Sequence, residues 1–172
     1  QKIYRALAQN IAKHDDYEIL TPIGLVPHPL IGSVWAANPN GKPSKSLAKV
    51  ISRSASATTF EVSLGSGRPH QIRIHLASIG HPLVGDALYR AGRSRVPGPV
   101  GEFPRQALHA ARLAFIHPQS GQAVQFESPL PADLDLTGHP VVTVLAALRD
   151  FKGITHAIDA WPTVLARHPD AR

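Results

Sequence analysis

The sequence predicts an α+β fold in which several short strands form a sheet and one well-marked helix lies near the middle of the chain. Two features predict the strands: apolar and polar residues alternate, and glycine and proline cluster between the alternating segments. The helix is predicted by apolar residues that recur at helical spacing. With 172 residues, of which 43% are apolar and 17% charged, the chain has room for one domain with a sizeable core.

The strands are predicted from segments that alternate or that are bounded by turn residues. The clearest is "TTFEVSLGSG", in which apolar and polar residues alternate up to a pair of glycines. "KPSKSLAKVISRSA" fits either a strand or a short helix, and the Pro/Gly-rich "PIGLVPHPLIG" is expected to be a connection. "ALHAARLAFIHP" and "GQAVQFESPLP" predict a hairpin. The other expected strands are "KIYRALAQ", "YEILTPIG" and "GSVWAAN".

The helix is expected over residues 69–79. Ile72, Leu76 and Ile79 form an apolar stripe at helical spacing. Proline suits the first turn of a helix, glycine suits the position just after its end, and a further proline prevents continuation. The chain has these residues at Pro69, Gly80 and Pro82.

Two later segments have a different character. "RAGRSRVPGPVGEFPR" is rich in Gly, Pro and Arg and is expected to be a mobile basic loop. Residues 136–172 have helical spacing, and we expect them to form a helical tail of unclear origin, separate from a domain of residues 1–135. The linker is placed near residues 133–140.

The charge of the chain is positive and uneven. The formal net charge is +6, and residues 42–112 hold eleven Lys and Arg against three acids. This basic middle predicts a polyanion partner, RNA or DNA first, although a merely solvated basic face fits as well. No cysteine is present, which excludes disulfides, thiolate catalysis and cysteine-bound zinc. No apolar run is long enough for a membrane span, and the composition predicts a cytoplasmic protein without a membrane partner.

Chemistry-bearing residues concentrate in "GSGRPHQIRIHLASIGHPLVGDALY". Free N–H groups at the helix start, with Arg68 beside them, could bind an anion, but a plain strand–turn–helix with glycines for tight geometry fits equally. The histidines lack metal-ligand spacing, so no metal is expected. Asp86 is expected to cap the turn that follows it or to pair with a nearby arginine. A Ser66–His70–Asp86 triad has no support from spacing.

Arg73 is the most informative residue of this stretch, because it is a charge between Ile72 and Ile74. An arginine in such a setting usually needs a carboxylate or phosphate partner. No nearby acid is an obvious candidate. We therefore expect the partner of Arg73 to be a ligand or a residue outside this chain.

Three segments resemble a known family. "SGRPHQIRIHLASIGHPLVGDALY" is similar to the signature segment of the RluA-like RNA pseudouridine synthases, "LHAARLAFIHPQSGQAVQFESPLPADL" resembles the closing segment of their catalytic domain, and "KIYRAL" resembles the segment that carries their active-site tyrosine. The resemblance covers roughly residues 1–135, as the C-terminal part of the catalytic domain. It implies a mixed, largely antiparallel sheet with flanking helices, and isomerisation of uridine to pseudouridine in ribosomal or transfer RNA.

By this resemblance, Tyr4 matches the tyrosine that stacks on the flipped base and helps proton transfer from C5. Arg73 matches the basic residue that pairs with the catalytic aspartate, and Ile72 would line the pocket beside the tyrosine. Arg68, His70 and Gln71 would lie near the RNA backbone or the flipped nucleotide. The family requires no cofactor or metal.

One departure from the family pattern concerns catalysis. The nucleophilic aspartate of the family lies in an H-R-L-D segment upstream of the tyrosine strand, and that segment does not occur in these 172 residues. We therefore expect a fragment of the enzyme that lacks the N-terminal half of the catalytic domain and has no activity alone. Two alternatives stay open: a non-catalytic RNA-binding remnant of the same fold, and an unrelated protein with a phosphate site at the turn before the helix.

Overall fold

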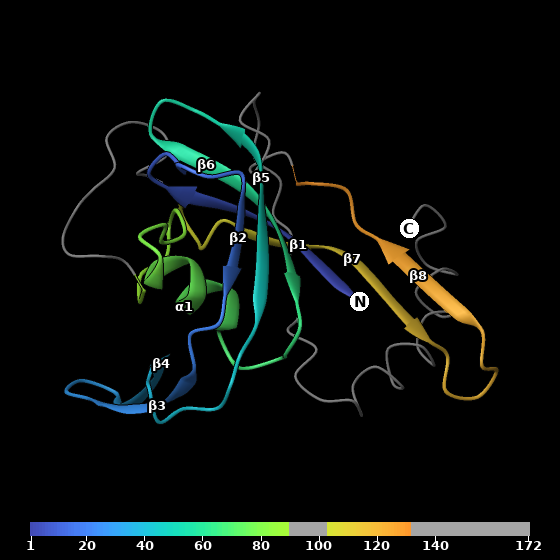
Figure 1. The fold of residues 1–172 in the computed structure, drawn as a ribbon, viewed down its shortest axis with the longest axis horizontal. Coiled ribbons are helices and arrows are strands. Elements are labelled where there is room, and N and C mark those ends of the chain that lie inside the picture. The colour runs from blue at the N-terminus through green and yellow to red at the C-terminus, as the bar shows by residue number, and fades with distance from the viewer. Residues whose placement is uncertain (90–102, 132–172) are drawn as a thin grey trace.

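A computed structural model describes residues 1–89 and 103–131 of the chain, as eight strands and one helix (Figure 1). The expected alternating segments all contain strands, and the ambiguous segment at residues 42–55 forms a strand rather than a helix. The elements are β1 (Lys2–Gln9), β2 (Asp16–Ile19), β3 (Ile23–His28), β4 (Gly32–Ala37), β5 (Ser46–Arg53), β6 (Ala57–Leu64), α1 (Gln71–Ser78), β7 (Leu108–Ile116) and β8 (Ala123–Glu127).

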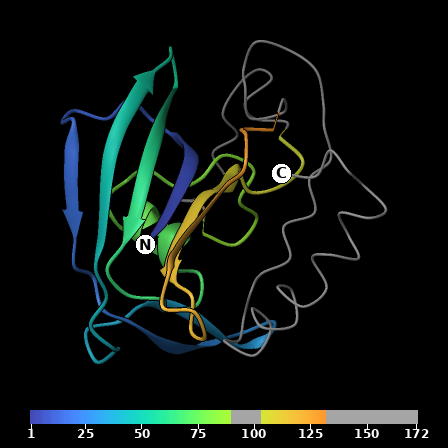
Figure 2. The same ribbon diagram turned by 90° about the vertical axis from the view of Figure 1, so that its right-hand side faces the viewer.

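Six of the strands form one sheet in the order β2-β5-β6-β1-β7-β8, and each pairing between these strands is antiparallel. This confirms the largely antiparallel α+β fold that the sequence predicts. The view in Figure 2 shows the strands turning progressively along the sheet, as the right-handed twist of strands requires. β1, the first strand of the chain, lies in the interior of the sheet between β6 and β7.

The main core lies between α1 and one face of the sheet. Because side chains alternate along a strand, Ala6 and Ala8 of β1 face the same side as Phe60 and Val62 of β6. The apolar stripe of α1 packs onto this side, as its spacing predicts. The fully or almost fully buried members of this main cluster are Ala6, Ala8, Ala12, Ile19, Ala48, Phe60, Val62, Ile72, Leu76 and Leu83.

Three segments that are distant in the sequence close a ring of backbone hydrogen bonds. The N–H of Leu7 donates to the carbonyl of Ala107, the N–H of Ala107 to Val84, and the N–H of Val84 to Leu7, over 2.9, 2.9 and 3.0 Å. All three residues are buried and belong to a second apolar cluster with Ala57. The ring satisfies three donors and three acceptors that burial would otherwise leave unpaired. It fixes the segment after α1 against β1 and the approach to β7.

The segment predicted to be a Pro/Gly-rich connection contains a strand instead. β3 pairs with β4 as a separate two-stranded sheet, which extends to the lower left in Figure 1. Pro27 lies within β3 opposite Ser33. A two-stranded sheet consists only of edge strands, where proline is tolerated, so the presence of Pro27 does not prevent the pairing.

The basic loop expected near residues 90–105 and the tail expected at residues 136–172 lie largely or wholly outside the described residues, as does the expected linker. Within the residues that are described, no helix is long and apolar enough to cross a membrane.

Candidate active site

α1 starts later than the sequence predicts and begins with an unusual residue. His70, at the N-cap, has a left-handed backbone with φ 55°, which is uncommon for any residue other than glycine. No side chain caps the helix there. The end of α1 follows the prediction, because Gly80 has φ 85° and Pro82 lies beyond it. The left-handed turn at His70 sets the direction in which α1 leaves the preceding loop.

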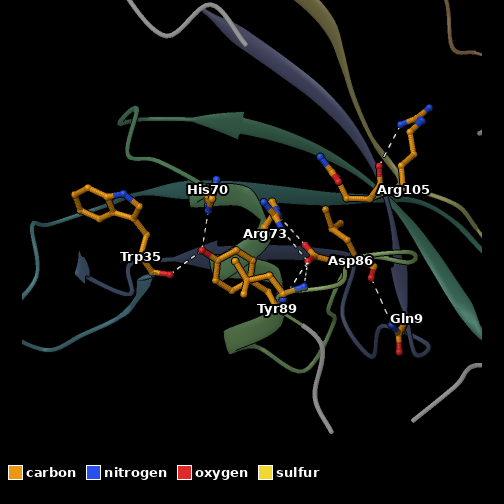
Figure 3. A network of polar contacts seen from close by, with 10 residues as sticks. Gln9, Trp35, His70, Arg73, Asp86, Tyr89 and Arg105 are labelled. Carbon is orange, nitrogen blue, oxygen red and sulfur yellow. Dashed lines mark hydrogen bonds and ion pairs between the residues drawn. The ribbon is translucent and has the colours of Figure 1, made fainter. Parts of the chain in front are cut away.

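Arg73 makes a two-pronged ion pair with Asp86 (Figure 3). Its Nε and Nη2 atoms donate to the two carboxylate oxygens of Asp86 over 2.7 and 2.8 Å. The Asp86 side chain has no exposed surface and that of Arg73 keeps 15%. The expectation that Arg73 has no partner within this chain is therefore wrong. The partner comes from the turn that follows α1, which the ring of backbone hydrogen bonds at Val84 holds beside the helix.

Asp86 fulfils both roles that the sequence predicts for it, capping and pairing. Its Oδ1 atom accepts the N–H groups of Leu88 and Tyr89 over 2.9 and 3.0 Å, in addition to the bond from Arg73. The preceding Gly85 has φ 69°, and a Cβ atom there would lie 1.9 Å from the carbonyl oxygen of Arg105. Only glycine allows this close approach of the two backbones.

The pairing shifts the pKa values of both partners. Burial by itself would raise the pKa of Asp86, but the bonds from Arg73 and the two N–H groups, together with the arginine charge, lower it below its usual range. The hydrogen bond to Asp86 raises the pKa of Arg73, and burial offsets only part of that increase. Both groups are therefore charged at neutral pH.

Tyr89 is a member of the site that sequence reasoning missed. Its ring lies under the Arg73 guanidinium, with 4.7 Å from Cζ to the ring centroid. Its hydroxyl donates to the carbonyl of Trp35 in β4 over 2.7 Å and lies 2.8 Å from Nδ1 of His70 (Figure 3). Because the phenol has one proton, His70 must donate at Nδ1. An aromatic residue shortly after the only acid of the signature stretch was a signal for this contact.

Tyr4 and Ile72 both lie at the main cluster, and the pocket that the resemblance implies for them stays a prediction. Tyr4, opposite Val62 in β6 and Ala110 in β7, is partly buried and packs against the main cluster, to which Ile72 belongs. Burial raises the pKa of Tyr4, so its phenol is protonated at neutral pH. Among the described residues, no hydrogen bond or cation–π contact joins Tyr4 to Arg73.

Gln71 is buried rather than available to a ligand. Its Oε1 atom accepts from the hydroxyl of Ser66 and the N–H of Arg68 over 2.9 and 3.0 Å. Its Nε2 atom donates to the carbonyl of Lys45 and the hydroxyl of Ser46 over 2.8 and 3.0 Å. With 2% of its surface exposed, Gln71 joins α1 to the sheet. These bonds give Gln71 a structural role, and its contact with RNA stays a prediction.

His75 extends this network one turn along the helix. The ring is fully buried, its Nε2 atom donates to the carbonyl of Thr21, and its Nδ1 atom accepts from the hydroxyl of Ser46, each over 2.9 Å. Burial lowers the pKa of His75 despite the bond to Thr21, so the ring is neutral. Gln71, His75 and Ser46 thus form a network whose donors and acceptors are matched.

The remaining predicted residues flank the start of α1. Among the described residues, the guanidinium of Arg68 makes two long bonds, of 3.4 Å each, to the carbonyl of Pro43, so it is weakly held. Ser66, His70 and Asp86 do not form a triad, because Ser66 bonds to Gln71 and His70 to Tyr89. The described residues contain no group of three His, Cys, Asp or Glu side chains that could hold a metal ion.

Comparison with known proteins identifies similar RNA pseudouridine synthases. Residues 1–78 match a family model described as RNA pseudouridylate synthase. An RNA pseudouridine synthase of Synechocystis is 39% identical over 140 residues, which cover 78% of this chain and 47% of the relative. The ribosomal large subunit pseudouridine synthase D of Nitrosomonas europaea is 47% identical over 118 residues, covering 66% of this chain and 33% of the relative. The chain thus spans a third to a half of the length of these relatives.

A solved structure supports the fold. The human RNA pseudouridylate synthase domain containing 1 superposes with a TM-score of 0.63 over 92% of this chain and 65% of its own. Its sequence is 24% identical, so this likeness concerns the fold alone.

Proposed function

We propose that the chain belongs to the RNA pseudouridylate synthase family, whose model its residues 1–78 match, and that it forms the Arg73-bearing part of an enzyme that isomerises uridine to pseudouridine in RNA. The observation that carries the proposal is the arrangement of Arg73. Asp86 occupies two of the five N–H groups of its guanidinium, and no acceptor among the described residues occupies the Nη1 edge. The same helix presents Ile72 to the cluster against which Tyr4 packs. A basic edge and a tyrosine are the groups that the family chemistry uses.

In the proposed reaction the target uridine leaves its stack and enters the site. A carboxylate attacks C1′ and the bond between C1′ and N1 breaks. The base turns, and C5 bonds to C1′ as the carboxylate leaves. C5 then loses its proton and N1 takes one up, so that the product is an isomer and no co-reactant is consumed. Tyr4 would stack on the base, for which its partly buried ring beside the main cluster is suited, and would assist removal of the C5 proton.

The attacking carboxylate is proposed to come from outside these 172 residues. The sequence contains no H-R-L-D segment, and Asp86 is committed to Arg73 and to two backbone N–H groups. The second carboxylate would bind the Nη1 edge of Arg73, which leaves the pair with Asp86 intact. Arg68 and His70 are proposed to lie near the RNA backbone, and ribosomal or transfer RNA in the cytoplasm is the proposed substrate.

The proposal is tested by comparing the 172-residue chain with the product of the complete reading frame. Both are incubated with ribosomal and transfer RNA labelled with tritium at C5 of uridine, and tritium release measures turnover. We expect release from the longer product, none from the 172-residue chain, and an in-frame H-R-L-D segment upstream. Absence of that segment, with RNA still bound, would instead favour the RNA-binding remnant.

Tyr4→Ala in the active protein should abolish tritium release while RNA affinity changes little, because the tyrosine acts on the base and not on the phosphates. Arg68→Ala is the complementary variant. It should weaken RNA binding and reduce the dependence of affinity on salt by about one phosphate contact. A Tyr4→Ala protein with near-normal turnover would remove Tyr4 from the mechanism.

A further inference from the structure

We infer that Asp86 and Tyr89 are positioning residues for Arg73: together they aim its guanidinium so that the Nη1 edge stays available to an incoming carboxylate. The inference rests on the function proposed above, because Arg73 matters only where a second acid approaches it. It goes further by assigning roles to two residues of the turn after α1.

Asp86 occupies one edge of the Arg73 guanidinium. A guanidinium is planar, and two parallel hydrogen bonds to one carboxylate fix both its position and its plane. Asp86 uses the Nε and Nη2 atoms, which leaves the Nη1 atom at the far edge. The Asp86 carboxylate is itself held by the N–H groups of Leu88 and Tyr89, so it cannot follow a displaced arginine.

The ring of Tyr89 covers one face of the guanidinium at 4.7 Å. Edge and face are thus both fixed, and the side chain of Arg73 keeps only 15% of its surface exposed. Tyr89 is fixed in turn by its hydroxyl, which donates to the Trp35 carbonyl and accepts from His70. The β3–β4 hairpin and the start of α1 therefore both influence the orientation of the Arg73 guanidinium, because both bind the hydroxyl of Tyr89.

Two substitutions separate these contributions. Asp86→Asn keeps Oδ1 for the two backbone N–H groups and for Nη2, but replaces the acceptor of the Nε proton with an amide NH₂. Tyr89→Leu removes the ring, whereas Tyr89→Phe keeps the ring and removes only the hydroxyl. Asp15→Asn is the matched control, since Asp15 forms an ion pair with Arg53 but has a side chain 76% exposed.

Two readouts are measured for each variant. One is the ¹⁵N–¹H signal of the Arg73 Nε group in the 172-residue chain, which needs no activity. The other is kcat and KM for tritium release in the active protein. For Asp86→Asn we expect the Nε proton to exchange faster and kcat to fall about 10- to 100-fold, with KM changing less than about threefold. Tyr89→Leu should lower kcat about tenfold, Tyr89→Phe less, and Asp15→Asn not at all.

The outcomes distinguish the two proposals. An unchanged Nε signal and an unchanged kcat in Asp86→Asn would overturn the positioning role even if the enzyme is active. A changed Nε signal in a protein that never forms pseudouridine would uphold the aiming of Arg73 and sink the proposed reaction. A loss of kcat that merely parallels a loss of folded protein, measured by circular dichroism, would assign Asp86 a structural role only.

Discussion

Helix α1 carries two polar assemblies that differ in whether their hydrogen-bonding capacity is used up. On one side, Gln71 and His75 form a buried network with Ser46 in which every donor meets an acceptor. On the other, Arg73 is bound by Asp86 along one edge while its Nη1 edge has no acceptor among the described residues. The first assembly can only hold the helix in place. The second has a donor to offer, and this difference separates a structural cluster from a candidate site although both lie in "QIRIH".

The largest expected effect comes from Gly85→Ala, which disturbs the backbone that positions Asp86 beside Arg73. The added Cβ would lie 1.9 Å from the Arg105 carbonyl oxygen, so the backbone must move and carry Asp86 with it. We expect the free energy of unfolding to fall by about 4 kcal/mol or more in a denaturant titration. Gly80→Ala is the control, because Gly80 also has positive φ but open space around it, and it should cost only about 1 kcal/mol.

Arg73→Ala should have the next largest effect on stability, because it leaves the fully buried Asp86 carboxylate without its cation. We expect a loss of about 3 kcal/mol in unfolding free energy, in addition to loss of any turnover. Glu18→Gln removes the ion pair between Glu18 and Lys45, whose side chains are about half exposed, and should cost no more than about 0.5 kcal/mol. Equal losses in the two variants would show that the Arg73 pair is not distinguished by its burial.

Gln71→Leu tests the buried network of Gln71, His75 and Ser46. Leucine fills a similar space but leaves the hydroxyl of Ser46 and the carbonyl of Lys45 without their donor. We expect a loss of about 2 kcal/mol, measured by chemical denaturation. If Gln71 instead contacts RNA, as the sequence suggested, the variant would lose RNA affinity at an unchanged unfolding free energy.

The smallest effect is a pH dependence that separates the assemblies. Burial lowers the pKa of His75 in the folded state, so the unfolded chain binds its proton first. The contribution of His75 is therefore complete above about pH 6.5 and declines as pH falls below that value, by at most about 1.4 kcal/mol per pH unit. His75→Gln should flatten this decline. The lowered pKa of Asp86 acts in a separate window, with stability lost only as pH falls below about 4.

Local sequence patterns predicted the strands and the helix, but not the tertiary contacts between them. The alternation of Phe60, Val62 and Leu64 and the stripe on α1 predicted a strand and a helix correctly, because each depends on neighbours in the sequence. β3 was missed because Pro27 argues against a strand, and only the edge position in a two-stranded sheet permits it.

The contacts within the site were likewise not predictable from local sequence patterns. The partner of Arg73 lies 13 residues away, beyond two chain reversals at Gly80 and Gly85, so its proximity depends on the tertiary fold. The burial of Gln71 likewise depends on β5, which no pattern around Gln71 reveals. The residue types predicted which chemical groups the site contains, but the tertiary fold determines which of their hydrogen-bonding groups are already paired within the chain.

The ring of backbone hydrogen bonds at Leu7, Val84 and Ala107 bears on how the protein is made. The ring cannot close until Ala107 has left the ribosome, and Leu7 is synthesised 100 residues earlier. At typical elongation rates, roughly 5 to 20 s separate the two events. During that time β1, which ends in the interior of the sheet, has one edge without its neighbour β7. Translation therefore leaves the backbone groups along this edge of β1 unpaired for seconds, and unpaired strand edges of this kind readily pair with other chains.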